Sequence, residues 1–147
     1  DNTRLQCMSC PYDCYTCADS INCLSCNDTT DFRVLYFNSS TNTSRCVPLN
    51  GYYDNAVTVA LPCQQQCSFC LNLTYCASCQ NGYFLRIDNQ CYSTCLDRYF
   101  ADAQLKICTR CPYDCLTCNK NGGCLTCNAT YDYRQLNTST SRCDPII

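Results

Sequence analysis

Apolar residues are scattered along this chain in short stretches, and their spacing matches no helical period. We therefore predict no amphipathic helix. The step Gly51–Tyr53, followed by Asp54 and the β-branched stretch 57–59, is typical of a short hairpin. Related aromatic steps occur at 82–84 and 99–100. The pattern predicts short β-hairpins, little regular secondary structure and no run long enough for a central hydrophobic core.

Cysteine spacing repeats three times along the chain. Twenty-one of the 147 residues are cysteine. In each repeat, gaps of three, two, five and two residues separate five cysteines, and a gap of 19, 11 or 15 residues precedes the sixth. Constant short gaps with one variable gap are typical of a tandem repeat with an adjustable loop. The sequence predicts cysteine-rich repeats at 1–62, 63–110 and 111–147, with a partial N-terminal hairpin and Cys7 in the first and a truncated hairpin in the third.

The repeat is also visible in other residue types. The sequence Cys-Pro-Tyr-Asp-Cys at 10–14 recurs at 111–115, and Ser-Arg-Cys at 44–46 recurs at 141–143. An aspartate stands nine residues before the first cysteine of every repeat: Asp1, Asp54 and Asp102. Both chain ends fall within a hairpin of this pattern, at Asp1 and Ile147. We therefore expect the chain to be an excerpt of a longer repetitive protein, the alternative being that flanking residues are merely disordered or clipped.

Composition indicates a secreted or cell-surface protein. Cysteine at this density, in a chain without histidine, is typical of a disulfide scaffold in an oxidising compartment. Six Asn-x-Ser/Thr sequons agree with that compartment, and we expect N-linked glycans on them: Asn27, Asn38, Asn42, Asn72, Asn128 and Asn137. Asn27 and Asn128 occupy equivalent positions, directly after the fifth cysteine of their repeats.

The size of a repeat and the net charge narrow the class of protein further. A repeat of about 50 residues is too small for burial alone to stabilise it, so several bridges of roughly 2 to 4 kcal/mol each must contribute. The net charge is −2 and the ten basic residues are dispersed, which argues against a nucleic-acid or anionic-membrane surface. The sequence contains no transmembrane stretch, and we expect no direct membrane insertion of this segment.

Known catalytic and metal-binding patterns fit the chain poorly. Eight Cys-x-x-Cys pairs could bind zinc, but the sequons and the lack of histidine favour bridges, and no cofactor is expected. A Ser-His or Cys-His nucleophile is impossible without histidine, and no catalytic residue or enzymatic activity is predicted. Asp13 and Asp114 are expected to cap their own turns. Four tyrosines could form a binding strip, although packing over disulfides is the favoured role: Tyr12, Tyr52, Tyr53 and Tyr113.

The hairpin of the first repeat, at 47–62, lacks the two extra cysteines that flank the hairpin of the second. We expect packing to replace that bridge, by four apolar residues: Val57, Val59, Ala60 and Leu61.

These motifs resemble the furin-like, growth-factor-receptor cysteine-rich repeat, and more closely its versions in surface proteins of ciliates and other single-celled eukaryotes. The resemblance rests on Cys-Pro-Tyr-Asp-Cys, on Cys-Leu-Ser/Thr-Cys at 23–26 and 124–127, and on Gly-Tyr-Tyr-Asp at 51–54. It covers nearly the whole chain. It implies a small disulfide-rich fold of tandem modules that form an elongated rod. As a guide to function it is weak, since such repeats serve receptors, proteases and coats alike.

The resemblance also implies a disulfide pairing, because spacing alone leaves connectivity open. The implied bridges are Cys10–Cys17, Cys14–Cys23, Cys26–Cys46, Cys63–Cys70, Cys67–Cys76, Cys79–Cys91, Cys95–Cys108, Cys111–Cys118, Cys115–Cys124 and Cys127–Cys143. Cys7 is left over, unpaired or in an interchain bond.

Three classes of function remain open. We favour an extracellular structural protein, a glycosylated and disulfide-stapled rod that is a segment or subunit of a surface coat or filament. The rivals are a ligand-binding receptor ectodomain and a shielding surface antigen. For the structural class we expect copies of the chain to associate head to tail, with Cys7 at the joint.

Overall fold

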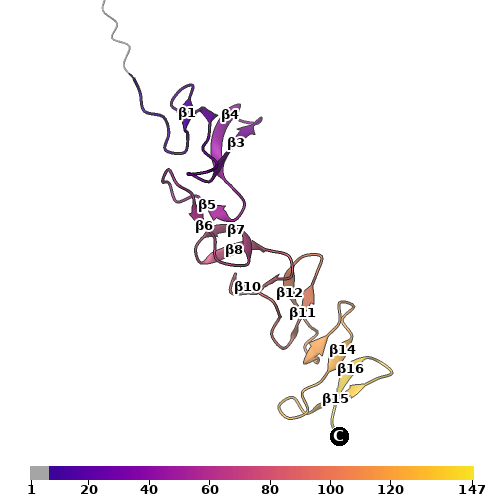
Figure 1. Cartoon of the computed structure of the whole chain (residues 1–147). Helices are drawn as coiled ribbons and strands as arrows, with labels where there is room; N and C mark the ends of the chain where they lie inside the picture. Colours follow the sequence, from indigo (N-terminus) through magenta and orange to yellow (C-terminus); the bar gives the residue numbers. More distant parts are fainter. Residues whose placement is uncertain (1–6) are drawn as a thin grey trace, which may run out of the picture. The chain divides into compact units, whose positions relative to one another are not determined.

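The computed structural model describes residues 7–147 and contains two compact units that divide between Tyr75 and Cys76. Every regular element in this part of the chain is a short β-strand, and none is a helix (Figure 1). The prediction of a small, disulfide-rich fold of tandem modules with short hairpins is confirmed. The division lies inside the predicted second repeat at 63–110, so a compact unit and a sequence repeat are different partitions of the chain.

The first compact unit consists of short antiparallel hairpins. Its strands are β1 (Thr16–Cys17), β2 (Cys23–Ser25), β3 (Arg33–Asn38), β4 (Thr43–Pro48), β5 (Tyr52–Tyr53), β6 (Leu61–Pro62) and β7 (Cys67–Asn72). The pairs β1–β2, β3–β4 and β5–β6 are each a two-stranded sheet. The β-branched stretch 57–59 lies in the loop between β5 and β6 and not in a strand. The predicted hairpin therefore exists, but its strands are shorter than the sequence indicated.

Local turn chemistry shapes β3–β4, the long hairpin of this unit. Its strands pair in register from Arg33 opposite Pro48 to Asn38 opposite Thr43. The Asn38 side chain accepts a hydrogen bond from the Ser40 amide at 3.0 Å. Asn42 adopts a left-handed backbone, with φ 52°, which asparagine tolerates better than most residues. The turn is thus specified by the asparagines of two adjacent sequons.

The second compact unit contains a small sheet and two hairpins. Strand β8 (Tyr75–Cys79) spans the division between the units. The remaining strands are β9 (Phe84–Leu85), β10 (Cys91–Tyr92), β11 (Tyr99–Asp102), β12 (Ile107–Arg110), β13 (Thr117–Cys118), β14 (Cys124–Thr126), β15 (Arg134–Asn137) and β16 (Arg142–Pro145). The order β10-β9-β12-β11 forms a four-stranded sheet, and β13–β14 and β15–β16 are two-stranded. In this sheet β9 and β12 run parallel at Leu85 and Ile107.

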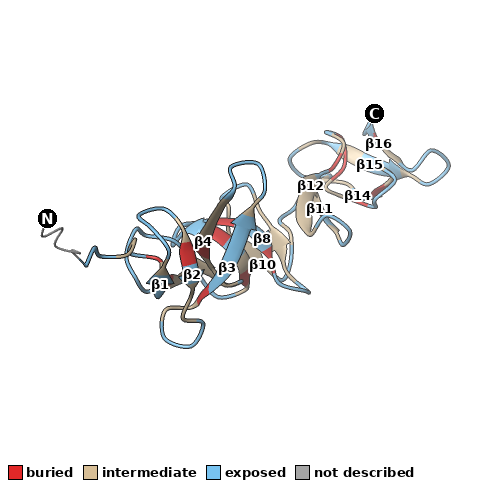
Figure 2. Ribbon diagram, turned by 90° about the horizontal axis from the view of Figure 1, so that it is seen from above, coloured by how far each residue is buried: buried red, intermediate tan, exposed pale blue. Residues whose placement is uncertain are grey.

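The core consists almost wholly of sulfur. Ala60 is the one buried apolar residue of the described chain that is not a cysteine. Buried positions form short, separated stretches along the ribbon (Figure 2). Three charged residues are also buried: Asp13, Arg33 and Asp114. Since buried charge is costly unless it is paired, these three residues require partners.

Each hairpin between repeats is hydrogen-bonded to the repeat that follows it. The Gly51 amide donates to the Ser68 carbonyl at 2.9 Å, and the Arg98 amide donates to the Leu116 carbonyl at 2.6 Å. Ser68 and Leu116 each directly follow the second cysteine of their repeat. Gly51 and Arg98 both have a left-handed backbone, with φ 86° and 69°. The two joints therefore share one backbone geometry, which glycine adopts without strain.

Candidate functional site

Disulfides connect the short strands of every repeat. The structure joins Cys10–Cys17, Cys14–Cys23, Cys26–Cys46, Cys63–Cys70, Cys79–Cys91, Cys95–Cys108, Cys111–Cys118, Cys115–Cys124 and Cys127–Cys143. These are pairs that the family resemblance implies. Cys67 and Cys76 are disulfide-bonded as well. Within the described residues Cys7 is the free cysteine, and its side chain is exposed.

The two recurring motifs of repeats one and three contact each other. Asp13, from Cys-Pro-Tyr-Asp-Cys, accepts hydrogen bonds from Arg45 Nε at 2.8 Å and Nη2 at 2.7 Å, and from the Cys46 amide at 3.2 Å. Asp114 accepts from Arg142 Nη2 at 2.5 Å and from the Cys143 amide at 3.1 Å. We call these two ion pairs the Asp–Arg clamps. Each clamp ties the first turn of a repeat to the strand that carries its sixth cysteine.

Both clamp aspartates are held ionised. Burial alone would raise the pKa of Asp13, but hydrogen bonds from Arg45, from its own amide and from the Cys46 amide outweigh burial and lower it. For Asp114 burial is again opposed, by the amides of Cys143 and of Asp114 itself and by the positive charge of Arg142, and its pKa is lowered. The sequence predicted local capping alone, and the structure adds partners about 30 residues away.

Arg33 is the buried cation of the first compact unit. Its side chain is 0% exposed and makes five hydrogen bonds within the fold. It donates to the carbonyls of Thr58, Val57 and Cys46 at 2.9, 2.8 and 3.1 Å, and to both carboxylate oxygens of Asp54 at 3.0 and 3.3 Å. A guanidinium can donate hydrogen bonds to all of these oxygens because its N–H donors are fixed in one plane.

Arg33 corrects the expected role of the apolar residues in hairpin 51–62. We expected four of them to pack, yet Val57 and Val59 are 46% and 42% exposed. Ala60 is buried, and Leu61 is half-buried. Hydrogen bonds from Arg33 to the loop carbonyls, and not packing of the valines, therefore hold this hairpin in place.

Aromatic side chains complete the contact between Arg33 and the hairpin. The Tyr12 hydroxyl donates to Asp54 at 2.9 Å, and its ring centroid lies 5.4 Å from the Arg33 guanidinium carbon. Tyr52 stacks on Phe32 with ring centroids 4.4 Å apart. Tyr53 is half-buried, whereas Tyr113 is 73% exposed. Tyr12 and Tyr52 thus contact Asp54, Arg33 and Phe32, Tyr113 is largely exposed, and packing of these tyrosines over disulfides stays a prediction.

The sequence contained a signal for Arg33 that the cysteine pattern obscured. An arginine stands seven residues after the fifth cysteine of every repeat, as Arg33, Arg86 and Arg134. In the second repeat Arg86 donates to the Thr94 carbonyl at 2.7 and 3.1 Å and lies over the Tyr92 ring at 3.8 Å. An arginine at a constant distance from the fifth cysteine, within a gap of variable length, indicates a structural contact independently of the cysteine pattern.

The sequon asparagines lie in turns at the surface. Asn42 and Asn72 are exposed, and Asn27, Asn38, Asn128 and Asn137 are half-buried. In Asn27 the side-chain oxygen accepts from the Thr29 hydroxyl at 2.9 Å and from the Thr30 amide at 3.1 Å. In Asn128 the same oxygen accepts from the Tyr131 amide at 2.9 Å. These bonds engage the amide oxygen and not Nδ2, the atom that a glycan would modify.

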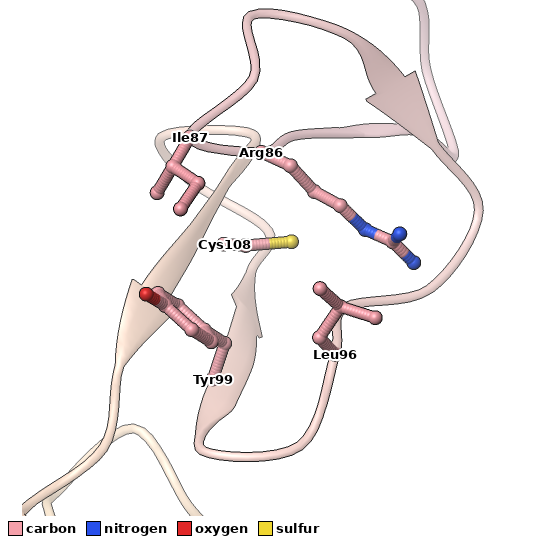
Figure 3. Close-up of a pocket in the computed structure, with 5 residues that line it drawn as sticks. All are labelled: Arg86, Ile87, Leu96, Tyr99 and Cys108. Carbon is pink, nitrogen blue, oxygen red and sulfur yellow. The ribbon is translucent and has the colours of Figure 1, made fainter.

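The described residues border several hollows, and one of about 360 Å³ is lined by Asp102, Gln104, Lys120 and Asn121. The pocket lined by Arg86, Ile87, Leu96, Tyr99 and Cys108 has a volume of about 20 Å³, room for about one water (Figure 3). An open apolar hollow of about 370 Å³ borders Tyr52, Phe69 and Leu71. No buried side-chain nitrogen or oxygen among the described residues is without a partner.

Groups of cysteine and aspartate that could resemble metal sites are made of bridged sulfur. Asp13 with Cys14 and Cys23, and Asp114 with Cys115 and Cys124, bring their ligand atoms within 4.8 Å. The cysteines of both groups are disulfide-bonded, and a bridged sulfur is not the thiolate that zinc binds. Each aspartate is already occupied by its clamp arginine. The described residues contain no helix that is long and apolar enough to cross a membrane.

The fold and these contacts define a disulfide-rich repeat protein of an extracellular kind. No family model matches the chain. It is similar to "Cysteine repeat modular protein 2" of Tetrahymena thermophila, at 38% identity over 98 residues, which is 63% of this chain and 5% of that protein. It is also similar to "Cysteine repeat modular protein 1" of the same organism, at 29% identity over 133 residues, or 89% of this chain and 4% of that protein.

A protease is similar to the chain through a comparable stretch. "Furin-like protease 2" of Drosophila melanogaster is 32% identical over 131 residues, which is 86% of this chain and 7% of the protease. The chain thus spans about one twentieth of the length of the Tetrahymena relatives it matches and little more of the protease. The chain resembles the furin-like cysteine-rich repeats of such proteins, as its motifs indicated.

Proposed function

We propose that this chain is a structural, non-enzymatic segment of an extracellular coat or filament, a rod of disulfide-stapled repeats sheathed by N-linked glycans. The observation that carries the proposal is the pair of joints at Gly51 and Arg98. Each inter-repeat hairpin is hydrogen-bonded to the repeat after it, and hairpin 51–62 also accepts hydrogen bonds from Arg33 of its own repeat. Such contacts between neighbours allow a repeat protein to grow in length without a shared core.

Electron microscopy of the native material, combined with glycopeptide mass spectrometry, tests this proposal. Filaments or a continuous layer, with glycan on the turns that carry the sequons, are the expected result. Isolated ectodomains with bare asparagines would contradict it. The test needs no knowledge of a partner, because it reads the assembled state directly.

Head-to-tail association of copies is part of the same proposal. The exposed thiol of Cys7 supports it, because an odd cysteine in a secreted protein is available for an intermolecular bond. We expect a ladder of bands on a non-reducing gel that collapses on reduction. A single monomer band in both lanes, together with an absence of filaments, would refute the association.

A ligand-binding ectodomain is the second candidate, and one observation favours it. Tyr113, Tyr131 and Tyr133 are 73%, 82% and 69% exposed in the third repeat. Exposed aromatics near an arginine are typical of a binding surface. A glycan-free patch over these tyrosines in the native protein would support this class over the coat.

A further inference from the structure

Three side chains of the first repeat form a seat for the hairpin at the end of the same repeat. We define the hairpin seat as the tyrosine of Cys-Pro-Tyr-Asp-Cys and the two residues six and seven positions after the fifth cysteine. In the first repeat these are Tyr12, Phe32 and Arg33. Hairpin 51–62 covers the seat, with Tyr52 stacked on Phe32 and Asp54 bonded to both Tyr12 and Arg33.

The third repeat contains the same seat, formed by Tyr113, Tyr133 and Arg134. Arg134 donates to the Cys143 carbonyl at 2.8 Å, as Arg33 does to the Cys46 carbonyl at 3.1 Å. The guanidinium carbon of Arg134 lies 5.5 Å from the Tyr113 ring centroid, against 5.4 Å for the Arg33–Tyr12 pair.

Backbone hydrogen bonds fix the two seats in the same way. The Ile146 amide donates to the Tyr133 carbonyl at 2.8 Å, and the Leu49 amide donates to the Phe32 carbonyl at 2.9 Å. The seat of the third repeat is therefore fully formed without anything on top of it.

The two seats differ in their cover. Tyr113 and Tyr133 are 73% and 69% exposed, whereas Tyr12 is 40% exposed and Phe32 is half-buried. Arg33 makes five side-chain hydrogen bonds, and Arg134 makes one to the rest of the described chain. In the first repeat, the four additional bonds all go to residues 54–58 of the hairpin. The third repeat thus presents the donors and the rings but no acceptors.

We infer that the seat of Tyr113, Tyr133 and Arg134 binds a β-hairpin equivalent to 51–62, one that carries an aromatic residue and, two positions later, an aspartate. The aromatic would stack on Tyr133, and the aspartate would accept from Arg134 and Tyr113, as Tyr52 and Asp54 do in the first repeat. This inference deepens the proposed function, on which it rests, by naming the contact through which repeats follow one another.

An equivalent hairpin that follows the seat along the same polypeptide fits this seat better than hairpin 51–62 of a second copy. In each copy Tyr52 and Asp54 are already engaged on Phe32 and Arg33, and releasing them would break those bonds. In the first repeat the seat and its hairpin occur in covalent succession, which gives the hairpin a high local concentration. We therefore expect the occupant to follow the seat along the same polypeptide, as hairpin 51–62 follows the seat of the first repeat.

The second repeat shows that the seat is not a general feature of the fold. Gln65 stands where Tyr12 and Tyr113 stand, and Leu85 replaces the stacking aromatic. There Arg86 binds the Thr94 carbonyl, and the Cys95–Cys108 bridge closes the hairpin. Residue type thus changes together with the way the hairpin is held, which supports a specific role for the aromatic and arginine set.

The test extends the full chain by one hairpin. The sequence of residues 51–62 is appended after Ile147, where the register of the repeats places it. A matched control carries alanine in place of the aspartate of the appended hairpin. Amide hydrogen exchange of the appended residues and the ring signals of Tyr113 and Tyr133 are followed by NMR. We expect at least about tenfold slower exchange in the extended chain than in the control, with shifted ring signals for both tyrosines.

A second variant keeps the inference falsifiable if the extension changes the fold. Arg134→Gln in the extended chain should abolish the protection, while Arg134→Gln in the unextended chain leaves the Cys127–Cys143 bridge and the β15–β16 hairpin intact. Equal exchange in extended chain and control would overturn the inference. So would self-association of the unextended chain that buries Tyr113 and Tyr133, since a second copy would then be the occupant. Microscopy and glycan mapping are unaffected by either outcome, so failure here is distinguishable from failure of the coat proposal.

Discussion

At the scale of single residues, ion pairs provide stabilisation that apolar packing provides in larger domains. Arg33 is enclosed by carbonyl and carboxylate oxygens, and each Asp–Arg clamp spans a repeat from its first turn to its sixth cysteine. Removing one partner of a fully buried pair typically costs about 3 to 5 kcal/mol, and solvent screening lowers that cost here because Asp54, Arg45 and Arg142 are 40%, 42% and 42% exposed. These few positions are therefore more sensitive to substitution than the exposed valines around them.

Arg33→Gln should detach hairpin 51–62. Because five hydrogen bonds are lost or weakened and Asp54 is partly exposed, we expect a loss of about 2 to 3 kcal/mol in local stability. Amide exchange of residues 51–62 and limited proteolysis with bridges intact would measure it. Val59→Asp is the matched control and should change stability by less than about 0.5 kcal/mol, because Val59 is 42% exposed. A larger effect of Val59→Asp than of Arg33→Gln would contradict the assignment.

Stability should fall at acid pH through three aspartates. The pKa of Asp54, like those of Asp13 and Asp114, is lowered: burial raises it, but hydrogen bonds from Arg33, Ala56 and Tyr12 lower it more. A group with a depressed folded pKa contributes stability above its unfolded pKa, here 3.8, and loses it as the pH falls through the folded value.

Thermal melts with intact bridges should therefore be flat from about pH 5 to 7 and decline below about pH 4. The variant Asp13→Asn should start less stable and show a shallower decline. An identical acid decline in Asp13→Asn and the unmodified chain would show that the clamp does not contribute.

At the scale of elements, the two inter-repeat hairpins are held by different chemistry. Hydrogen bonds from Arg33 hold hairpin 51–62, whereas the Cys95–Cys108 bridge cross-links the hairpin between repeats two and three. In the chain-entropy model a bridge across a separation of 13 residues stabilises by about 3 kcal/mol. An ion-pair network and a covalent bond thus serve as alternatives at one position of the fold.

Removing the bridge with Cys95→Ser and Cys108→Ser should loosen residues 98–110 by about 2 to 4 kcal/mol and leave hairpin 51–62 unchanged. Amide exchange of both hairpins in one sample provides the internal control. A reductant should reproduce the pattern if it is titrated to open this bridge first. Equal loosening of the two hairpins would indicate that the repeats are coupled and not locally stabilised.

Sequence pattern predicted the elements far better than the contacts. Cysteine spacing and the Gly-Tyr-Tyr-Asp step indicated short hairpins, because the apolar residues between the cysteines have no helical period. The hydrogen bonds from Arg33 to hairpin 51–62 were not predicted. Two of the acceptors are backbone carbonyls 24 and 25 residues away, and a backbone carbonyl is not signalled by any residue type in the sequence. The clamp partners were visible only as two motifs that recur together, which shows covariation within the chain but not contact.

At the scale of the whole molecule, the sequons are the feature that separates a sheathed coat from a bare binding surface. Most of the six should carry glycan, with Asn27 and Asn128 the first, because each lies in a turn directly after a bridged cysteine. Glycopeptide mass spectrometry of native protein is the measurement, and enzymatic removal of glycan provides the control. Bare Asn27 and Asn128 would count heavily against the sheath.

The β3–β4 hairpin is anchored at its base and independent at its tip. Arg33 and the Cys26–Cys46 bridge secure the base, while the side-chain hydrogen bonds of residues 38–43 stay within the turn. The tip is thus a natural insertion point. A foreign peptide, such as an epitope or a fluorescent reporter, could be placed between Ser40 and Thr41 and displayed outward, with the cysteine scaffold folding as before.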